Sequence, residues 1–341
     1  MRSQPVGIKD VAQAAGVSLG TVSNVLNRPE LVSDAMRARV QVAIDELGFV
    51  RNGSASRLRS TRSKTIGLVV LDVGNPYFTE IARGAESAAE ERGYAVMLCN
   101  SDESGRREER HLSFLAEQRV GGILLTPTSP AVPETHLAAL RSHGVEVVLV
   151  DEASPALDVC SVSVDDVQGG HLAGQHLLAG GRRRLVYLSG SPTIRQCADR
   201  LTGLRDAIAE FAATSDDPVE LDLVDVTSMT GRAGYAATDT VLALEPDAIF
   251  AANDLLALGV LRGLLEREVK VPGDIALVGY DDIEFAGLAV IPISSVRQPA
   301  FEIGQSAVQL LLEECGDGAH AHQQVVFRPE LVVRRSSDAT R

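Results

Sequence analysis

IKDVAQAAGVSLGTVSNVLN, residues 8–27, contains two short helical patterns separated by a glycine. The apolar residues of the first pattern recur at the spacing of one helix face: Ile8, Val11, Ala12 and Ala15. Gly16 is placed to end that helix, and Ser18 is a favourable N-cap for the next one. The second helix has a short apolar face of its own: Val22, Val25 and Leu26. Two short helices joined by a tight turn predict a helix-turn-helix.

A third helix is predicted after the break at Asn27-Arg28-Pro29, beginning at Ser33 and ending at Gly48. Its inward-facing residues are expected to be Met36, Val40, Ala43, Ile44 and Leu47. The other face of the second helix carries small polar residues and no charge, a composition suited to the major groove of DNA. A generic three-helix bundle with a solvated polar face is the alternative interpretation.

The charge of the chain is unevenly distributed. Residues 1–64 carry ten Lys and Arg against five Asp and Glu, a formal charge of +5, whereas the whole chain carries −14. The body of the protein is therefore strongly acidic. A basic head on an acidic body predicts a polyanionic partner for the head alone.

The stretch from residue 8 to residue 27 resembles the DNA-binding signature of the lactose-repressor (LacI/GalR) family of bacterial transcription regulators, and the resemblance extends over essentially the whole chain. It implies that Leu19, Gly20 and Asn24 occupy base-reading positions. Because Gly20 has no side chain, discrimination between bases should depend on Leu19 and Asn24. The positions that contact phosphates or support base contacts are, by the same resemblance, Ser18, Thr21, Ser23 and Asn27.

The segment RNGSASRLRSTRSKT, residues 51–65, is polar, basic and poor in apolar residues, which predicts a linker. The resemblance implies a hinge helix that orders on DNA, with Ala55 and Leu58 entering the minor groove and Arg59 placed to follow them. The segment departs from the common family pattern, since Arg51 stands where proline is frequent and ASRL replaces ARxL. A purely flexible tether is the alternative. The expected domains are a helix-turn-helix head (1–50), a hinge (51–64) and a body (65–341).

From Ile66 onward, apolar runs of strand length alternate with helical patterns, which predicts an α/β fold with parallel sheets covered on both faces. The runs are too numerous for one compact sheet, so two doubly wound lobes are expected. The resemblance likewise implies a body like that of periplasmic sugar-binding proteins, which binds an effector and forms the dimer. The predicted strands are IGLVVLD, AVMLCNS, GGILLTP, VEVVLVDE, RRLVYLSG, LDLVDV, AIFAAND and IALVGYDD.

Polar residues gather where these apolar runs end: Asp72, Asn75, Thr126, Asp151, Asn253, Asp254, Asp281 and Asp282. In open parallel sheets, ligands bind at the carboxyl ends of the strands. A cleft between two such sheets, rimmed with carboxylates and amides, suits a neutral or cationic polyhydroxylated ligand. We therefore expect an effector site that includes Asn75, Thr126, Asp151, Asn253 and Asp281.

Aromatic and basic residues complete the expected effector site. Tyr77 and Phe78 match family positions that pack against ligand rings, although both could simply belong to the core. Arg200 matches an arginine that grips ligand hydroxyls, and the alternative is a buried arginine bridging two aspartates. Arg195 and Gln196, on the preceding loop, are secondary candidates.

Other residues near this site have simpler interpretations. Asn75 before Pro76 is also an ordinary helix start. Asp282 suits a turn cap, and Asp281 is the better match to the ligand-contacting carboxylate. Met229 stands where several relatives carry a stacking aromatic, which favours a sugar over a nucleobase.

Catalysis, metals and membranes find no support in the sequence. It lacks the common dinucleotide, phosphate-loop and zinc-protease motifs, and its four cysteines form no CxxC pair. His320 and His322 lie in a Gly/Ala-rich loop and are expected to be exposed and metal-free. No cofactor, membrane span or signal segment is expected, and the predicted compartment is the cytoplasm.

Together these features predict a homodimeric transcription regulator, a repressor, that binds a pseudo-palindromic operator and responds to a small-molecule effector, a sugar or sugar derivative. A periplasmic-type sugar-binding protein without a DNA role is the alternative from another class, because the body alone would fit it.

Overall fold

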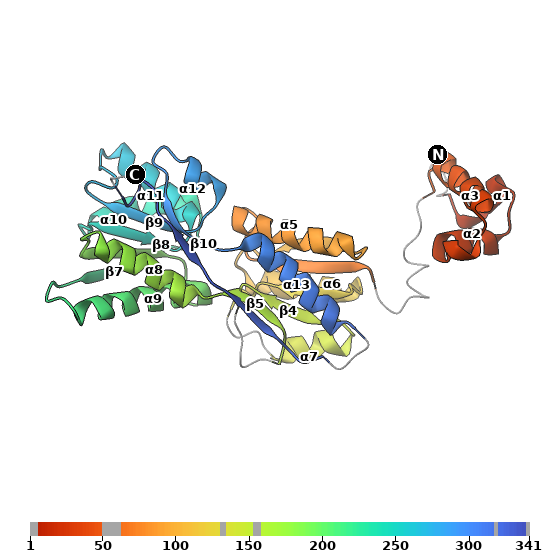
Figure 1. The fold of residues 1–341 in the computed structure, drawn as a ribbon, viewed down its shortest axis with the longest axis horizontal. Helices are drawn as coiled ribbons and strands as arrows, with labels where there is room; N and C mark the ends of the chain where they lie inside the picture. Colours follow the sequence, from red (N-terminus) through yellow and green to blue (C-terminus); the bar gives the residue numbers. More distant parts are fainter. Residues whose placement is uncertain (1–5, 50–62, 130–133, 153–157, 317–319, 339–341) are drawn as a thin grey trace. The chain divides into compact units, whose positions relative to one another are not determined.

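The computed structural model describes residues 6–49, 63–129, 134–152, 158–316 and 320–338. The chain divides into two compact units, Met1–Thr61 and Arg62–Arg341, here called the head and the body (Figure 1). Residues 50–62, which contain most of the predicted hinge, lie outside the described residues. The domain boundaries at residues 50 and 64 therefore stay predictions.

The head is a three-helix unit with a small apolar core. Ser18 caps the second helix, since its Oγ accepts a hydrogen bond from the Thr21 N–H at 3.0 Å. Gly16 ends the first helix at a φ of 62°, a conformation that glycine adopts without strain. Its helices are α1 (Ile8–Ala15), α2 (Leu19–Asn27), the 3₁₀ helix η1 (Pro29–Leu31) and α3 (Asp34–Leu47).

The core of the head is formed by Val11, Ala12, Ala15, Val22, Val25, Val40 and Ala43. The sequence pattern was wrong at Ile8 and Met36, each of which is 36% exposed. Ile8 begins α1 and Met36 lies in the first turn of α3, so both are at the starts of their helices.

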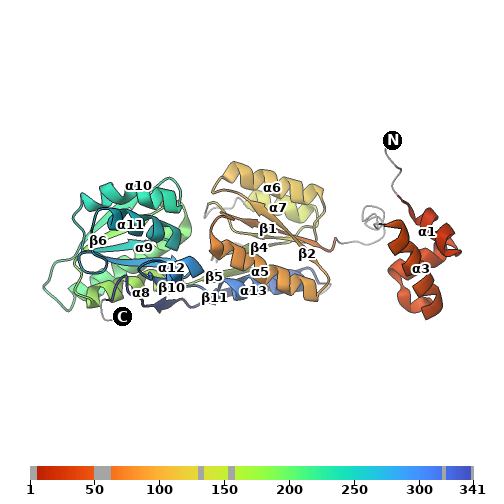
Figure 2. The ribbon, with the colours of Figure 1, turned by 90° about the horizontal axis from the view of Figure 1, so that it is seen from above.

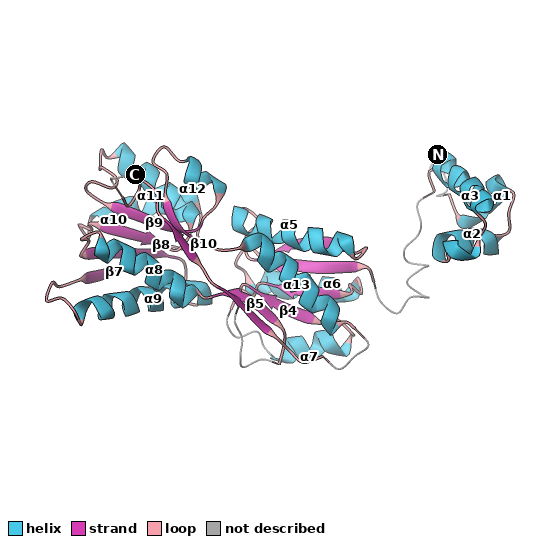
Figure 3. Cartoon of the chain, viewed as in Figure 1, coloured by secondary structure: helices cyan, strands magenta, loops and turns pink. Residues whose placement is uncertain are grey.

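The body contains two six-stranded sheets, each covered by helices on both faces (Figures 2 and 3). The first sheet, in the order β11-β5-β4-β3-β1-β2, is parallel throughout and forms the N-lobe. Its strands are β1 (Thr65–Val70), β2 (Ala95–Asn100), β3 (Gly122–Leu125), β4 (Val147–Val150), β5 (Ser161–Val164) and β11 (Gln324–Phe327). Its helices are α5 (Pro76–Glu91), α6 (Gly105–Glu117), α7 (Glu134–Ser142) and α13 (Ala300–Glu314).

Successive side chains along each strand point to opposite faces of the N-lobe sheet, so the sheet contributes to an apolar core on each face. Ile66 and Leu68 of β1 pack with Ile81 of α5 on one face. Val69 packs with Leu112 and Leu115 of α6 on the other face. The apolar runs are continuous because both faces are covered.

The second sheet, in the order β12-β10-β9-β8-β6-β7, forms the C-lobe, and only its β10–β12 pair is antiparallel. Its strands are β6 (Arg184–Ser189), β7 (Glu220–Asp225), β8 (Ala248–Ala251), β9 (Ala276–Asp281), β10 (Ser294–Arg297) and β12 (Glu330–Val332). Its helices are α8 (Asp166–Ala179), α9 (Arg195–Ala212), α10 (Gly231–Leu242), α11 (Asp254–Glu266) and α12 (Glu284–Leu288).

The chain passes between the lobes three times. It leaves the N-lobe after β5 to enter α8, returns after β10 to form α13, and crosses again from β11 to β12 (Figure 1). Each lobe is thus built from residues that are distant in sequence, and three connections join the lobes.

All eight strands predicted from the sequence are present, and the predicted doubly wound two-lobed architecture is confirmed. Four further strands were not predicted from the sequence: β5, β10, β11 and β12. They are short, and β5 reads SVSV, which resembles a half-exposed strand although all four residues are buried. Among the described residues, no helix is both long and apolar enough to cross a bilayer.

Candidate functional site

The outer face of α2 presents the three predicted base-reading residues together. Leu19, Gly20 and Asn24 are all exposed, and α2 carries no charged side chain. Gly20 and Asn24 are four residues apart and therefore lie on one face of the helix. This face can approach base edges without charge repulsion from the helix itself.

The residues predicted to contact phosphates or support α2 are hydrogen-bonded to one another. The hydroxyls of Ser18 and Thr21 are 2.9 Å apart, and the Asn27 amide donates to the Ser23 carbonyl at 2.8 Å. These bonds brace both ends of α2. The predicted hinge residues Ala55, Leu58 and Arg59 lie outside the described residues, so their minor-groove role stays a prediction.

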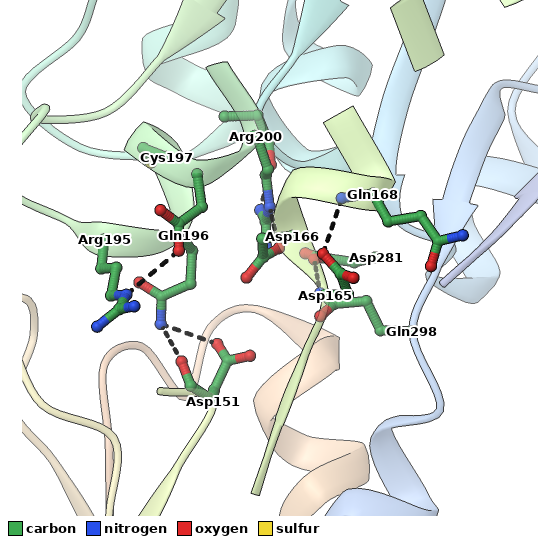
Figure 4. Close-up of polar contacts among 12 residues, drawn as sticks. Asp151, Asp165, Asp166, Gln168, Arg195, Gln196, Cys197, Arg200, Asp281 and Gln298 are labelled. Atoms are coloured by element: carbon green, nitrogen blue, oxygen red, sulfur yellow. Dashed lines mark hydrogen bonds and ion pairs between the residues drawn. The ribbon is translucent and has the colours of Figure 1, made fainter. Parts of the chain in front are cut away.

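A second cluster of predicted site residues lies between the lobes of the body. It surrounds a cavity of about 30 Å³. Figure 4 shows the polar contacts around it. The lining residues are Leu71, Asn75, Tyr77, Phe78, Asp151, Ile194, Gln196, Arg200, Met229, Asn253 and Asp281. The structure thus brings together seven of the nine predicted effector residues: Asn75, Tyr77, Phe78, Asp151, Arg200, Asn253 and Asp281.

Asn75 combines the two roles that the sequence left open. Its Oδ1 accepts from the Tyr77 N–H at 3.0 Å and caps α5. Its amide donates to Asp281 Oδ2, across the cleft in the C-lobe, at 2.9 Å. The helix cap therefore holds the amide in place for a contact between the lobes.

Asp151, at the end of β4, is the centre of a second polar bridge. The Tyr77 hydroxyl donates to its Oδ1 at 2.7 Å. The Gln196 amide of the C-lobe donates to its backbone carbonyl at 2.6 Å (Figure 4). Burial and, to a lesser extent, the nearby Asp166 carboxylate raise the pKa of Asp151 to about 8, against the opposing charge of Arg200. The closed cleft therefore holds this carboxyl group largely protonated at neutral pH.

Arg200 is buried on α9. Its Nε donates to Asp166 Oδ1 at 2.7 Å, and its Nη1 donates to the Ala252 carbonyl at 2.6 Å. The guanidinium also stacks on the Tyr280 ring, 3.6 Å from its centroid. The alternative interpretation was a buried arginine that bridges two aspartates. Within the described part of the chain, Arg200 forms an ion pair with one aspartate, Asp166. Among the described residues, Nη2 has no hydrogen-bond partner, so one edge of the fork remains available at the cavity.

Asp281 completes the C-lobe side of the cleft. It accepts hydrogen bonds from Asn75 and from Gln298, the latter at 2.8 Å. Burial raises its pKa to about 6, against the opposing effects of the Arg200 charge and these two hydrogen bonds. Asp281 and Asp151 also have positive φ angles, 101° and 59°, which are uncommon for residues other than glycine. Such strain is typical of functional sites.

Two predicted effector residues do not line the cavity. Thr126 is fully buried after β3, and its hydroxyl has no hydrogen-bond partner among the described residues. Arg195 is paired with Glu152 of the N-lobe and with Asp199, both at 3.2 Å. Its side chain is 34% exposed, so Arg195 joins the lobes beside the cavity rather than within it.

Family models of known proteins match both the head and part of the body. The model of bacterial regulatory proteins of the lacI family matches residues 7–52, and a periplasmic binding protein-like domain matches residues 174–337. The ribose operon repressor of Escherichia coli (strain K12) is 34% identical over 336 residues, covering 97% of this chain and 99% of the repressor.

The chain belongs to the LacI family.

Two solved structures extend the likeness to three dimensions. A transcriptional regulator CelR–cellobiose complex is 33% identical, with a TM-score of 0.71, over 97% of this chain and 100% of that chain. The lac repressor dimer bound to operator and the anti-inducer ONPF is 26% identical, with a TM-score of 0.82, over 98% and 99% of the two chains. This LacI-family chain is thus an effector-responsive DNA-binding transcription regulator and not an enzyme, and the alternative of a binding protein without a DNA role is wrong.

Several side chains of this LacI-family cleft were missed from the sequence. Asp166 holds Arg200, Gln298 holds Asp281, and Tyr280 lies under the guanidinium. Asp166 and Gln298 begin crossings between the lobes rather than ending an apolar run, so the strand-end signal could not find them. Asp282 forms ion pairs with Arg297 and Arg334, in agreement with a structural role.

Proposed function

We propose that this chain represses transcription as a homodimer in the cytoplasm, and that a neutral sugar bound between the lobes of the body changes its affinity for a pseudo-palindromic operator. The head would read one half-site per protomer through Leu19 and Asn24. Residues 51–64 would form the hinge that transmits the state of the body. The description of the lac repressor as an operator-bound dimer supports this arrangement.

The observation that carries the proposal is the polar bridge across the cleft. Asn75 with Asp281 and Gln196 with Asp151 connect the two lobes through the side chains that line the cavity. A cavity of about 30 Å³ is far smaller than the roughly 300–1,000 Å³ of ordinary ligand sites. An effector must therefore separate the lobes and take over these hydrogen bonds. In this way its binding alters the angle between the lobes.

The charges around the cavity favour a neutral ligand. Asp151 and Asp281 line it, Asp166 lies behind it, and Arg200 is the one basic side chain among the described residues that line it. Since Asp166 already pairs with Arg200, a phosphate group would meet an excess of carboxylates. Hydroxyl groups can both donate to carboxylates and accept from amides and Arg200. The names of the ribose operon repressor and of the CelR–cellobiose complex also support a neutral sugar as the effector.

A thermal-shift screen of the full chain tests the effector class, with D-ribose, cellobiose, ribose 5-phosphate and adenosine as probes. At a concentration of 100 Kd, a bound ligand stabilises the native state by about 2.7 kcal/mol, which raises Tm by several degrees. We expect a neutral sugar to produce this shift in the wild type and no shift in Asp281→Ala. A larger shift with the sugar phosphate would contradict the proposal. A gel shift with duplexes selected from a random library then measures the effect of that sugar on operator affinity.

Asn24→Ala tests the reading of DNA by the head. We expect base preference to relax at one operator position, at a cost of about 1–3 kcal/mol there, because an asparagine side chain can make paired hydrogen bonds to a base edge. Competition against duplexes that carry single base-pair changes measures the preference. Gln41→Ala, an exposed substitution on α3, is the control. Equal weakening on every duplex would instead assign Asn24 to phosphate contact.

The thermal stability of the effector-free protein should depend on pH through the buried carboxyl groups of the closed cleft. Burial raises the pKa of Asp151 to about 8 and that of Glu152 to about 7, the latter against the opposing charge of Arg195. Because the closed state then binds more protons than the unfolded state, this contribution to stability is lost as the pH rises through 7 and 8. We expect the Tm of the effector-free protein to fall between pH 6.5 and 8.5. The decrease should be smaller in Asp151→Asn, and an equal decrease in both proteins would refute this cause.

A further inference from the structure

Four potential metal ligands lie together at the edge of the N-lobe sheet opposite the effector cleft. Cys160 precedes β5, His320 and His322 precede β11, and Glu314 ends α13. Since β5 and β11 are parallel neighbours, their amino ends meet at this edge, whereas the cleft lies at the carboxyl ends. The sequence suggested no metal role for these residues, because they come from three separate segments.

The donor atoms of the cluster converge on one point. Cys160 Sγ lies 3.0 Å from His320 Nε2 and 3.8 Å from His322 Nδ1. Glu314 Oε1 lies 3.4 Å from the same Nδ1. All four donor atoms are within 4.8 Å of one another. A tetrahedral Zn²⁺ site with bonds of about 2.0–2.3 Å requires ligand atoms separated by roughly 3.3–3.7 Å, so only small adjustments are needed.

Glu314 gives an independent indication that a cation is required. Its side chain is only 5% exposed, and its Oε2 is buried without a hydrogen-bond partner among the described residues. A buried carboxylate in this condition is costly unless a cation neutralises it. Among the described residues, no lysine or arginine forms an ion pair with Glu314, and the basic groups near it are Arg141 and the imidazoles of His320 and His322.

The surroundings of His322 fit metal coordination as well. While its Nδ1 faces Cys160 and Glu314, its Nε2 faces the carboxylate of Asp158 at 3.6 Å. A histidine that ligates a metal usually directs its second ring nitrogen to such an acceptor, which fixes the orientation of the ring. Asp158 is exposed and therefore stands outside the donor set.

We propose that Cys160, Glu314, His320 and His322 bind one Zn²⁺ ion per chain as a structural site. A thiolate, two imidazoles and a carboxylate form a donor set suited to this borderline-soft ion. The thiolate and the carboxylate balance its two positive charges. Four protein ligands complete the tetrahedron, so the site ties the segment before β11 to β5 and to the end of α13.

Cobalt titration of the full-length, untagged, chelator-treated protein tests the site. We expect one equivalent of Co²⁺ to bind per chain, to give tetrahedral d–d bands and a thiolate-to-cobalt charge-transfer band, and to be displaced by one equivalent of Zn²⁺. Cys160→Ser should lose the charge-transfer band. Glu314→Gln and His320→Ala should bind Co²⁺ at least about 100-fold more weakly, since loss of a ligand exceeds the 10–100-fold effect of outer partners.

Matched controls separate this site from unspecific binding. Cys99→Ser removes another buried cysteine of the N-lobe, and His143→Ala removes an exposed histidine of the same lobe. Both variants should keep the spectrum and the stoichiometry. Zn²⁺ should also raise the Tm of the wild type but not that of Glu314→Gln, a change that preserves side-chain shape. The proposal is overturned if binding is not stoichiometric, if Cys160→Ser keeps the charge-transfer band, or if Zn²⁺ stabilises Glu314→Gln as much as the wild type.

Discussion

Arg200→Ala should abolish effector binding and lower the free energy of unfolding of the body by about 3–5 kcal/mol, because it removes one partner of a buried ion pair. Asp166 would lose its charge partner, and the Ala252 carbonyl would lose a donor. The ligand would in turn lose the open edge of the guanidinium, whose planar fork lysine cannot imitate. Calorimetric titration with the sugar found by screening and chemical denaturation measure the two effects.

The two parts of this prediction can be separated. Arg200→Ala combined with Asp166→Asn should recover part of the lost stability, because the unpaired charge is gone, while effector binding remains absent. Arg262→Ala, which removes an exposed arginine of the C-lobe paired with Glu266, should change stability by no more than about 1 kcal/mol. Binding to operator DNA without effector should persist in all three variants. Normal effector affinity in folded Arg200→Ala would place the site elsewhere.

Gly203→Ala should destabilise the C-lobe by about 3 kcal/mol or more, an effect comparable to that of Arg200→Ala. At this position a Cβ would overlap the backbone carbonyl of Val167, because α8 and α9 are in close backbone contact here. On the facing helix, a Cβ at Gly170 would overlap the carbonyl of Arg200. The backbone cannot yield as a flexible side chain could, so the helices must separate.

The displacement should also reach the cleft, because α9 carries Gln196 and Arg200. We expect weaker effector binding in the Gly203→Ala protein that remains folded, together with a lower denaturation midpoint. Gly105→Ala on α6 is the matched control, since its Cβ would meet Thr128 Oγ1 at an ordinary 3.4 Å and alanine favours the helix. A wild-type midpoint in Gly203→Ala would show that the helix pair is loosely packed.

Periodicity and residue type were sufficient to predict the head and eight strands, because continuous apolar runs are typical of sheets that are covered on both faces. The same rule located most of the cleft, since the carboxyl ends of parallel strands converge. It overreached at Thr126, whose buried side chain does not line the cavity. A strand end gives the position of a residue but not the direction in which its side chain points.

The contacts themselves could not be predicted, because they depend on how the lobes close. Asn75 and Asp281 are 206 positions apart, and Arg200 is paired with a residue 34 positions earlier. The edge strands β11 and β12 lack strong apolar patterns because they are partly exposed. For the same reason, nothing in the sequence placed His320 beside Cys160.

The three passages between the lobes have a consequence for biosynthesis. Each sheet of the body is complete only after a strand near the carboxyl terminus has been synthesised. This strand is β11 in the N-lobe and β12 in the C-lobe. The head has its own core within residues 6–49. At about 5–20 residues per second, the ribosome completes the head on the order of half a minute before either lobe can close. A chain that ends between residue 50 and residue 324 therefore keeps the DNA-reading helices but lacks a complete effector-binding body.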